Sequence, residues 1–194
     1  METRDRRFFP KVLFEILRSE QLVRDDSVNN NNIGRMIMAI ETVRTYLKKF
    51  GKENKIQEFP VSSATVELAA SALGVEGARI AKSMSFYPKE GSGCMIIVMA
   101  GDKKIDNSKF KHYFGMKAKM LHTEDVEALT GHAPGGVCPF ANPENTSVYL
   151  DESLKRFDTV FPACGSENSA IELTCEELYY CANAIEWIDV CKSL

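Results

Sequence analysis

Lys82 is the first residue whose type and position indicate chemistry. The segment Ile80–Tyr87 alternates strictly between two sets of side chains, which predicts a β-strand. Lys82 then shares one strand face with three apolar side chains, Ile80, Met84 and Phe86. A lysine on an apolar face can extend its ammonium group outward from the edge of a sheet. Alternatively, it stands inside a cleft, where the ammonium group meets an anion or a carbonyl, and the residues alone leave both interpretations open.

A second candidate is the segment at residues 131–142, called here the glycine loop. It holds three glycines and two prolines in twelve residues, and its apolar side chains favour burial. Such a loop packs against the core, and its glycine backbone can approach a ligand closely. The N–H groups of Gly135, Gly136 and Val137 remain as donors, because prolines have none. An irregular connection between two strands is the alternative interpretation.

The remaining candidates lie in a small-residue loop at residues 163–168, after another predicted strand. This loop, the glycine loop and Lys82 could line one pocket, which would lack an obvious protein general base. Cys138 and Cys164 lie in the two loops, but neither has a neighbouring cation in the sequence to lower its pKa. We therefore do not expect a cysteine nucleophile, and we interpret the lone His132 as structural.

Cysteine and histidine spacing argues against a metal centre or a cofactor. The six cysteines form no C-x-x-C pair, and the chain has only three histidines. No P-loop, dinucleotide fingerprint, H-E-x-x-H or G-x-S-x-G motif occurs. The longest apolar run, Cys94–Ala100, has seven residues, too few to span a bilayer. Together with dispersed thiols and no secretory signal, these features predict a cytoplasmic protein without membrane contact.

The net charge of −3 conceals a gradient along the chain. Residues 1–55 carry a net charge of +4, residues 56–139 are neutral overall, and residues 140–194 carry −7. A polyanion would therefore contact the N-terminal part or a local basic patch rather than the acidic C-terminal third.

The elements that must position these candidates divide the chain in two. Residues 8–23 and 33–50 show helical spacing of apolar residues and are separated by a polar linker. We interpret residues 1–54 as a helical extension, whose first helix, at residues 8–23, could instead form a homodimer contact. Residues 55–194 then form the functional domain, whose length suits one compact fold.

Within residues 55–194, short strands in adjacent pairs are interspersed with helices. The expected strands lie near residues 55–61, 80–87, 94–100, 118–121, 147–150, 159–164, 170–173 and 185–190. The expected helices cover residues 66–73, 107–114, 124–130 and 175–183, with N-terminal caps at Ser62 or Ser63, at Thr123 and at Thr174. This order predicts an α+β fold with a curled, barrel-like sheet, mostly antiparallel or mixed, flanked by helices.

Three stretches together resemble the YbaK/EbsC-type family of aminoacyl-tRNA deacylases, the ProX-type prolyl-tRNA editing domains. Ala81-Lys82-Ser83 resembles the lysine strand of that family. Gly131–Phe140, with Gly135-Gly136-Val137-x-Pro139, resembles its glycine–proline loop. Gly165–Leu173, ending before a capped helix, resembles its last loop and strand. The resemblance covers about residues 55–191.

The resemblance implies hydrolysis of the ester that joins a wrong amino acid to the terminal ribose of a tRNA. It implies a catalytic set of Lys82, Gly135 and Gly136, with the lysine near the 3′ end of the substrate. The implied substrate-binding residues are Ser83, Val137, Cys138, Pro139, Phe140, Ala163, Cys164, Gly165 and Ser166. The implied partners are the 3′ acceptor end of an aminoacyl-tRNA, such as tRNA(Pro) carrying Cys or Ala, and prolyl-tRNA synthetase.

This implied activity agrees with the chemistry of the residues. Backbone N–H groups of a glycine loop suit a carbonyl oxygen that gains negative charge during acyl transfer. An ammonium group facing a cleft can hold a phosphate or the ribose region of the tRNA. A protein general base is dispensable if the vicinal hydroxyl of the substrate helps to position the water.

The sequence also departs from the family. Some members carry Ser-Gly-Gly and an Asp before the last strand, where this chain has Ala163-Cys164-Gly165 and Ala170. The pocket wall therefore differs in polarity, and the accepted amino acid stays open. A non-catalytic tRNA- or synthetase-binding module of the same fold is the alternative. Lys82 and the glycine loop favour the enzyme, whereas the acidic C-terminal third fits the binding module.

Overall fold

The structure is a computed structural model of the 194-residue chain, and it describes Gly34 and residues 38–194. The chain forms two compact units, Met1–Met38 and Ala39–Leu194. The predicted helix at residues 8–23, the polar linker and the start of the predicted helix at residues 33–50 lie outside the described residues. The predicted division at residue 54 stays a prediction, and residues 39–47 form a helix within the second unit.

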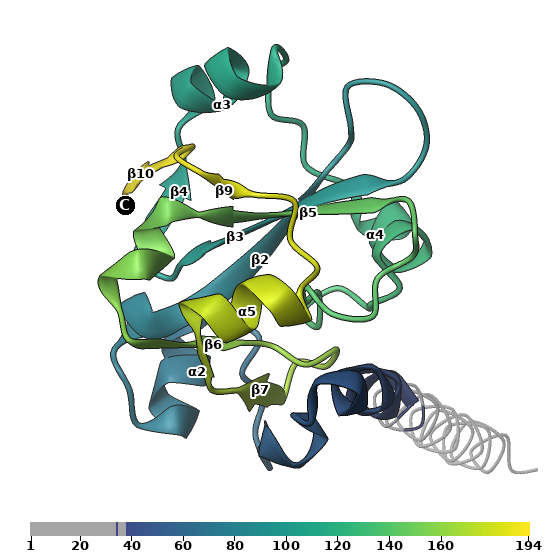
Figure 1. Cartoon of the computed structure of the whole chain (residues 1–194), viewed down its shortest axis with the longest axis vertical. Coiled ribbons are helices and arrows are strands. Elements are labelled where there is room, and N and C mark those ends of the chain that lie inside the picture. Colours follow the sequence, from purple (N-terminus) through teal and green to yellow (C-terminus); the bar gives the residue numbers. More distant parts are fainter. Residues whose placement is uncertain (1–33, 35–37) are drawn as a thin grey trace, which may run out of the picture. The chain divides into compact units, whose positions relative to one another are not determined.

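The elements after this helix alternate short strands with short helices (Figure 1). The strands are β1 (Ile56–Glu58), β2 (Ile80–Phe86), β3 (Cys94–Ala100), β4 (Lys103–Ile105), β5 (Thr146–Asp151), β6 (Thr159–Pro162), β7 (Ser169–Ile171), β8 (Leu173–Thr174), β9 (Trp187–Ile188) and β10 (Cys191–Ser193). The α-helices are α2 (Val66–Leu73), α3 (Asn107–Phe114), α4 (Thr123–Thr130) and α5 (Cys175–Cys181). The 3₁₀-helices are η1 (Lys48–Phe50), η2 (Glu53–Lys55), η3 (Gly77–Arg79) and η4 (Glu152–Arg156). No described helix is both long and apolar enough to cross a membrane.

A six-stranded mixed sheet forms the centre of the fold, in the order β8-β6-β2-β3-β5-β9. β2 pairs antiparallel with β3, whereas the pairs β2–β6, β3–β5 and β5–β9 are parallel. Two smaller antiparallel pairs, β1–β7 and β4–β10, extend the structure at its margins. The predicted α+β class with a curled, mixed sheet is therefore confirmed.

Both faces of the central sheet are buried. Successive side chains of β2 and β3 point alternately to one face and to the other. The larger core holds Ala81, Ile96 and Val98 and is covered by α5. The smaller core holds Phe86 and Met99 and is covered by α3, which lies on the other side of the central strands in Figure 1. This two-sided burial explains why β3 is apolar at every position.

Several element boundaries differ from the predictions for local reasons. Thr65, rather than Ser62 or Ser63, caps α2, because its hydroxyl accepts a hydrogen bond from the N–H of Leu68. α4 begins at Thr123 after His122 and lacks a side-chain cap. The predicted strand at residues 118–121 is reduced to one bridge, between Phe86 and Met120. The capping box at Thr174 and Glu177 is confirmed.

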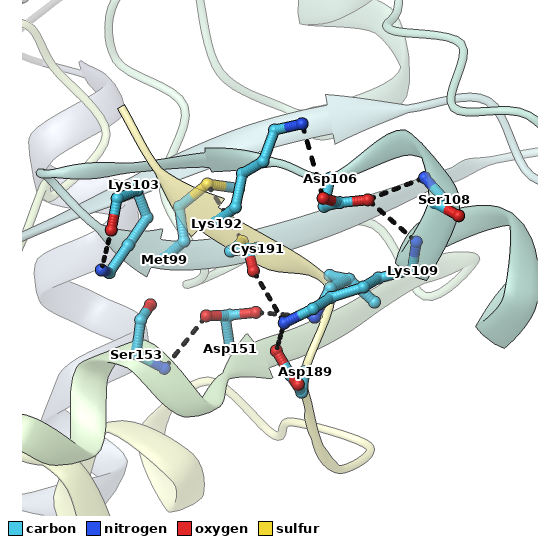
Figure 2. A network of polar contacts seen from close by, with 12 residues as sticks. Met99, Lys103, Asp106, Ser108, Lys109, Asp151, Ser153, Asp189, Cys191 and Lys192 are labelled. Atoms are coloured by element: carbon cyan, nitrogen blue, oxygen red, sulfur yellow. Dashed lines mark hydrogen bonds and ion pairs between the residues drawn. The ribbon is translucent and has the colours of Figure 1, made fainter.

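A polar network fastens the C-terminal strands to α3 (Figure 2). The carboxylate of Asp151, only 1% exposed, accepts hydrogen bonds from the N–H groups of Ser153 and Val190, both at 3.0 Å. Lys109 on α3 donates to Asp189 at 2.6 Å and to the carbonyl of Cys191 at 3.1 Å. These bonds hold the segment between β9 and β10 against α3. The predicted strand at residues 185–190 is reduced to β9, and β10 begins beyond it, at Cys191.

Candidate functional site

Lys82 is half-buried on β2, and its ammonium group has a fixed position. Its Nζ donates a hydrogen bond of 3.1 Å to the carbonyl oxygen of Gly101, in the turn after β3. Gly101 itself lies against η3, since a Cβ atom there would stand 2.0 Å from the carbonyl oxygen of Gly77. The Gly101 backbone, which holds the Lys82 ammonium group, is therefore packed against η3. Only a glycine fits at position 101.

Burial controls the charge of Lys82. Desolvation lowers the pKa of its ammonium group below the ordinary lysine value, and Cys191, Asp102 and Glu67 act in the opposite direction without cancelling the effect. Within the described part of the chain Lys82 has no salt bridge. An ammonium group that its own protein compensates only in part is suited to bind an anionic or carbonyl oxygen of a ligand.

The main chain of β2 is open along one edge next to Lys82. β6 pairs only with Ile80 and Ala81, and β3 occupies the opposite edge. Further along, the N–H of Leu121 donates to Ser85, and the N–H of Tyr87 donates to Lys119. Residues 82–84 lie between these two contacts and face no other described strand on that edge. This interval is called here the β2 gap.

Ser83 points to the other face of the sheet from Lys82. It pairs with Val98, whose side chain lies in the larger core. The buried side chains of the glycine loop and the small-residue loop lie in the same core. Its Oγ is buried and has no hydrogen-bond partner among the described residues. Burying a hydroxyl without a hydrogen-bond partner costs free energy. We therefore expect a bound group or a water molecule beside the Ser83 hydroxyl.

The glycine loop and the small-residue loop meet, as predicted. A Cβ atom on Gly136 would stand 2.7 Å from the carbonyl oxygen of Gly165. Gly135 adopts a positive φ of 88°, and the position of a Cβ atom there lies 3.7 Å from Ala64 and from Glu167. The two loops therefore touch through bare backbone, and the start of α2 lies alongside them.

The backbone donors of the glycine loop differ in part from the prediction. The N–H of Gly136 donates to the carbonyl of Ala133 at 2.9 Å, which closes a turn. It therefore does not point into a pocket, and the expectation of a free donor at Gly136 is wrong. The N–H groups of Gly135 and Val137 have no partner among the described residues. Gly135 is exposed and Val137 is partly exposed, whereas Gly136 is buried.

Three predicted substrate-binding side chains, those of Cys138, Phe140 and Cys164, are fully buried in the larger core. Burial raises the pKa of the Cys138 thiol to about 12 and that of the Cys164 thiol well above its ordinary value. Neither thiol is therefore a nucleophile at neutral pH. These residues could contact a substrate only through their backbone, and their role in binding stays a prediction.

His132 joins the two ends of the glycine loop. It is 2% exposed, and its Nε2 lies 2.8 Å from the carbonyl oxygen of Phe140 and 3.4 Å from Sγ of Cys138. Burial lowers the pKa of its imidazole below the ordinary histidine value, which favours the neutral form. This geometry agrees with a structural histidine.

The predicted site residues fall into an accessible and a buried group. Gly135 is exposed, and Lys82, Ser83, Val137 and Ala163 are partly exposed. The others are buried, namely Gly136, Cys138, Pro139, Phe140, Cys164, Gly165 and Ser166. Strand alternation places the Lys82 side chain on the face opposite the loops. The start of α2 links the two parts, because Ala64 lies beside Gly135 and the charge of Glu67 acts on Lys82.

Two residues near the site were missed by sequence reasoning. The first is Gly101. The Gly101-Asp102 pair indicated only a turn, but the carbonyl of Gly101 positions Lys82. Glu167 gave no signal beyond its place in the small-residue loop, although its Oε2 lies 3.7 Å from the Cβ position of Gly135. Neither contact can be deduced from local sequence, because each joins segments far apart in the chain.

Two grooves at the start of β6 contain none of the predicted site residues. One, of about 500 Å³, is lined by Lys55, Gln57, Thr159, Glu172, Thr174 and Glu177. The other, of about 370 Å³, is lined by Arg79, Arg156, Phe157, Asp158 and Thr159. Their charges largely pair with one another or with neighbours, as in Arg79 with Glu172 and Arg156 with Asp102. Across residues 38–194, no group of three or more His, Cys, Asp or Glu residues is arranged to hold a metal ion.

Comparison with known proteins assigns the family. The model of the aminoacyl-tRNA editing domain family matches residues 61–179, a stretch that contains Lys82 and both loops. The chain belongs to the aminoacyl-tRNA editing domain family. The resemblance seen in the sequence is thereby confirmed.

The chain is also similar to two individual proteins. The chain is 55% identical over 155 residues to the uncharacterized protein YwhH of Bacillus subtilis, covering 80% of this chain and 98% of YwhH. It is 29% identical over 120 residues to EbsC of Enterococcus faecalis, an inferred Cys-tRNA(Pro)/Cys-tRNA(Cys) deacylase, covering 61% of this chain and 73% of EbsC.

A solved structure supports the same fold. It is the crystal structure of an inferred trans-editing enzyme for prolyl tRNA synthetase, with a TM-score of 0.72 and 29% sequence identity. The match covers 80% of this chain and 98% of that one.

Proposed function

We propose that this protein hydrolyses the ester bond of mischarged aminoacyl-tRNA, with tRNA(Pro) carrying a small wrong amino acid such as Cys or Ala as the substrate. One observation carries the proposal: the stretch that matches the editing domain family contains Lys82 and both glycine-bearing loops, whose backbones touch at Gly136 and Gly165. The activity inferred for EbsC supports the choice of tRNA and amino acid.

In the proposed reaction, a water molecule attacks the ester carbonyl carbon and the terminal ribose leaves. The N–H groups of Gly135 and Val137 are the donors for the carbonyl oxygen as it gains negative charge. Gly136 contributes by lacking a Cβ atom, because this lets the glycine loop pack on Gly165. Lys82 holds a phosphate or the ribose region of the 3′ end at the β2 gap.

No described side chain of the accessible group is a general base. Gly135, Val137 and Ala163 have no ionisable side chain, the Ser83 hydroxyl is buried, and the Lys82 ammonium group donates to the carbonyl of Gly101. We therefore propose that the vicinal hydroxyl of the substrate ribose positions the attacking water, as the residues already suggested. The protein then supplies orientation and charge stabilisation rather than proton transfer.

The wall that faces the amino acid is small and apolar in this proposal. Ala163 is partly exposed, and Ala170, with which it forms an isolated bridge, is buried. An apolar wall separates side chains that differ by one methylene by only about 1–3 kcal/mol. Cys and Ala therefore both fit the proposal, whereas larger side chains would be excluded.

The partners follow from the same chemistry. The 3′ acceptor end of an aminoacyl-tRNA is the proposed ligand, prolyl-tRNA synthetase is a proposed protein partner, and the cytoplasm is the proposed compartment. A homodimer contact through the predicted helix at residues 8–23 stays a prediction. A non-catalytic tRNA- or synthetase-binding module is the second candidate, and the buried state of most predicted substrate-binding side chains is the observation that favours it.

Release of labelled amino acid from Cys-tRNA(Pro), Ala-tRNA(Pro) and Pro-tRNA(Pro) tests the proposal. We expect release from the first two well above the uncatalysed rate and little release from the cognate substrate. Uncatalysed rates with all three substrates, combined with measurable tRNA binding, would favour the binding module instead.

A further inference from the structure

Four exposed lysines form a basic surface beside the β2 gap. Residues 103–122 contain six lysines and one aspartate, a net charge of +5 in a chain whose total is −3. The lysine-rich face is defined here as Lys89, Lys111, Lys117 and Lys119. All four are exposed.

The charges of the lysine-rich face are not neutralised within the protein. Among the described residues, none of its four lysines has a salt bridge. Their neighbours Lys103, Lys109 and Lys192, by contrast, pair with Asp102, Asp189 and Asp106. Figure 2 shows the last two lysines in the network that holds α3 to the C-terminal strands. The anchored lysines thus serve the fold, and the lysine-rich face is left for a ligand.

Two chain segments bring these lysines together. The Nζ of Lys89 lies 3.5 Å from the position of a Cβ atom on Gly115, and the N–H of Gly115 donates to the carbonyl of Lys111. The Nζ of Lys119 lies 4.7 Å from the centre of the Tyr87 ring. The N–H of Tyr87 in turn donates to the carbonyl of Lys119 at 2.9 Å. The segments around Lys89 and Lys117 are therefore held side by side.

The lysine-rich face adjoins the β2 gap. Met120, next to Lys119, is 55% exposed and bridges to Phe86, two residues beyond the end of the β2 gap. Lys82 lies four residues further along β2, a distance of roughly 13 Å at the usual rise of a strand. On the other side, Glu124 and Asp125 begin α4, and Asp125 accepts a hydrogen bond from the Tyr87 hydroxyl. The acidic start of α4 therefore bounds the lysine-rich face on the side of Tyr87.

We propose that the lysine-rich face binds the phosphate backbone of the tRNA acceptor arm and directs its 3′ end into the β2 gap. This inference rests on the proposed function, because it names the surface that delivers the substrate to that site. Charge complementarity favours RNA over other occupants, since lysine ammonium groups bind phosphates as point charges and are left unpaired here. Two carboxylates of the acidic C-terminal third lie next to α3, but both have partners there: Asp189 pairs with Lys109, and Glu186 accepts a hydrogen bond from Tyr113.

The test compares Lys117→Gln/Lys119→Gln with the wild type on two substrates. One substrate is full-length mischarged tRNA(Pro), and the other is a short aminoacyl oligonucleotide that contains only the single-stranded 3′ end. We expect the KM for the tRNA to rise on the order of tenfold and the slope of log(kcat/KM) against log[salt] to shrink by about 1.5, for two lost phosphate contacts. Hydrolysis of the short substrate is expected to stay unchanged.

Two matched variants complete the test. Lys48→Gln/Lys49→Gln removes two exposed lysines of η1 that also lack salt bridges among residues 38–194, and it is expected to behave as the wild type. Lys117→Arg/Lys119→Arg retains the charge and is expected to retain the KM. Binding of uncharged tRNA(Pro) is measured in parallel for every variant.

An unchanged KM and salt slope in the Gln variant, with an active wild type, would overturn the docking surface while leaving the proposed hydrolysis intact. An equal loss on the short substrate would also overturn it, because the lysines would then act at the reacting end. A wild type that hydrolyses neither substrate, but binds tRNA in a manner dependent on Lys117 and Lys119, would remove the proposed function and keep the surface. Binding of an acidic protein but not of tRNA would overturn the choice of RNA.

Discussion

Gly136 approaches Gly165 so closely that a Cβ atom on Gly136 would stand 2.7 Å from the carbonyl oxygen of Gly165. Gly165 is also confined on its other side, where a Cβ atom would stand 2.9 Å from the Val43 side chain. The glycine loop, the small-residue loop and the helix at residues 39–47 are thus packed in one stack. Any side chain added at Gly136 must separate the two loops.

The first prediction concerns Gly136→Ala. Because the obstacle is backbone rather than a flexible side chain, we expect a loss of unfolding free energy of about 1–3 kcal/mol. Displacement of the neighbouring Gly135 and Val137 donors should also lower kcat for deacylation by at least tenfold. Urea unfolding and initial rates measure the two effects.

Gly91→Ala is the matched control for this variant. A Cβ atom at Gly91 meets nothing within 4 Å, but its φ of 83° makes alanine there cost about 1–2 kcal/mol. It should therefore destabilise the protein to a similar extent and leave deacylation unchanged. Equal activities of the two alanine variants would show that the contact between the loops does not serve catalysis.

The second prediction concerns the substrate. If the vicinal ribose hydroxyl positions the attacking water, replacing it with hydrogen should lower the enzymatic rate by about 10²–10⁴-fold. The uncatalysed hydrolysis of both substrates must be measured alongside, because the hydroxyl also affects the ester itself. An unchanged ratio of enzymatic to uncatalysed rate would remove the hydroxyl from the mechanism.

The third prediction concerns pH and stability. Burial raises the pKa of the Cys138 thiol from an ordinary value of 9.0 to about 12. Between these two pH values the folded chain keeps the thiol proton, whereas the unfolded chain loses it. The stabilisation is fully present below pH 9 and is lost as the pH rises toward 12. We expect the Cys138 thiol alone to contribute a slope of up to about 1.4 kcal/mol per pH unit to the fall in unfolding free energy.

Cys138→Ala tests this assignment by urea unfolding at several pH values. The variant loses packing at every pH, but it lacks the thiol that titrates. The difference in unfolding free energy between wild type and variant should therefore narrow above pH 9. A constant difference across the range would contradict the assignment.

The fourth prediction concerns the N-terminal part of the chain. Removal of residues 1–30 should leave the remaining chain folded, because the cores described here are built from residues 40–194. Thermal unfolding should stay cooperative. Loss of the cooperative transition would mean that the removed residues are part of the folding unit.

Much of the fold could be predicted from the sequence because the signals were local. Strand alternation located β2, an apolar run located β3, and the capping box located α5. Boundaries were less certain where tertiary contacts decide them, as for residues 118–121, which form one bridge instead of a strand.

The candidate site was predictable only in part. Glycine content indicated that the two loops pack closely, and the structure joins them at Gly136 and Gly165. The turn that engages the N–H of Gly136, the burial of Cys138 and the carbonyl of Gly101 that holds Lys82 all depend on contacts between distant segments. Sequence spacing carries no information about such contacts.

Release of amino acid from mischarged tRNA(Pro) by wild type and by Lys82→Ala tests the central claim most directly. We expect clear release by the wild type and by the control Lys48→Ala, and a fall of at least about 10²-fold for Lys82→Ala, since a charged group at the reacting end is lost. Folding of each variant is checked by its unfolding transition. Equal, background-level release by wild type and Lys82→Ala would contradict the proposed editing activity.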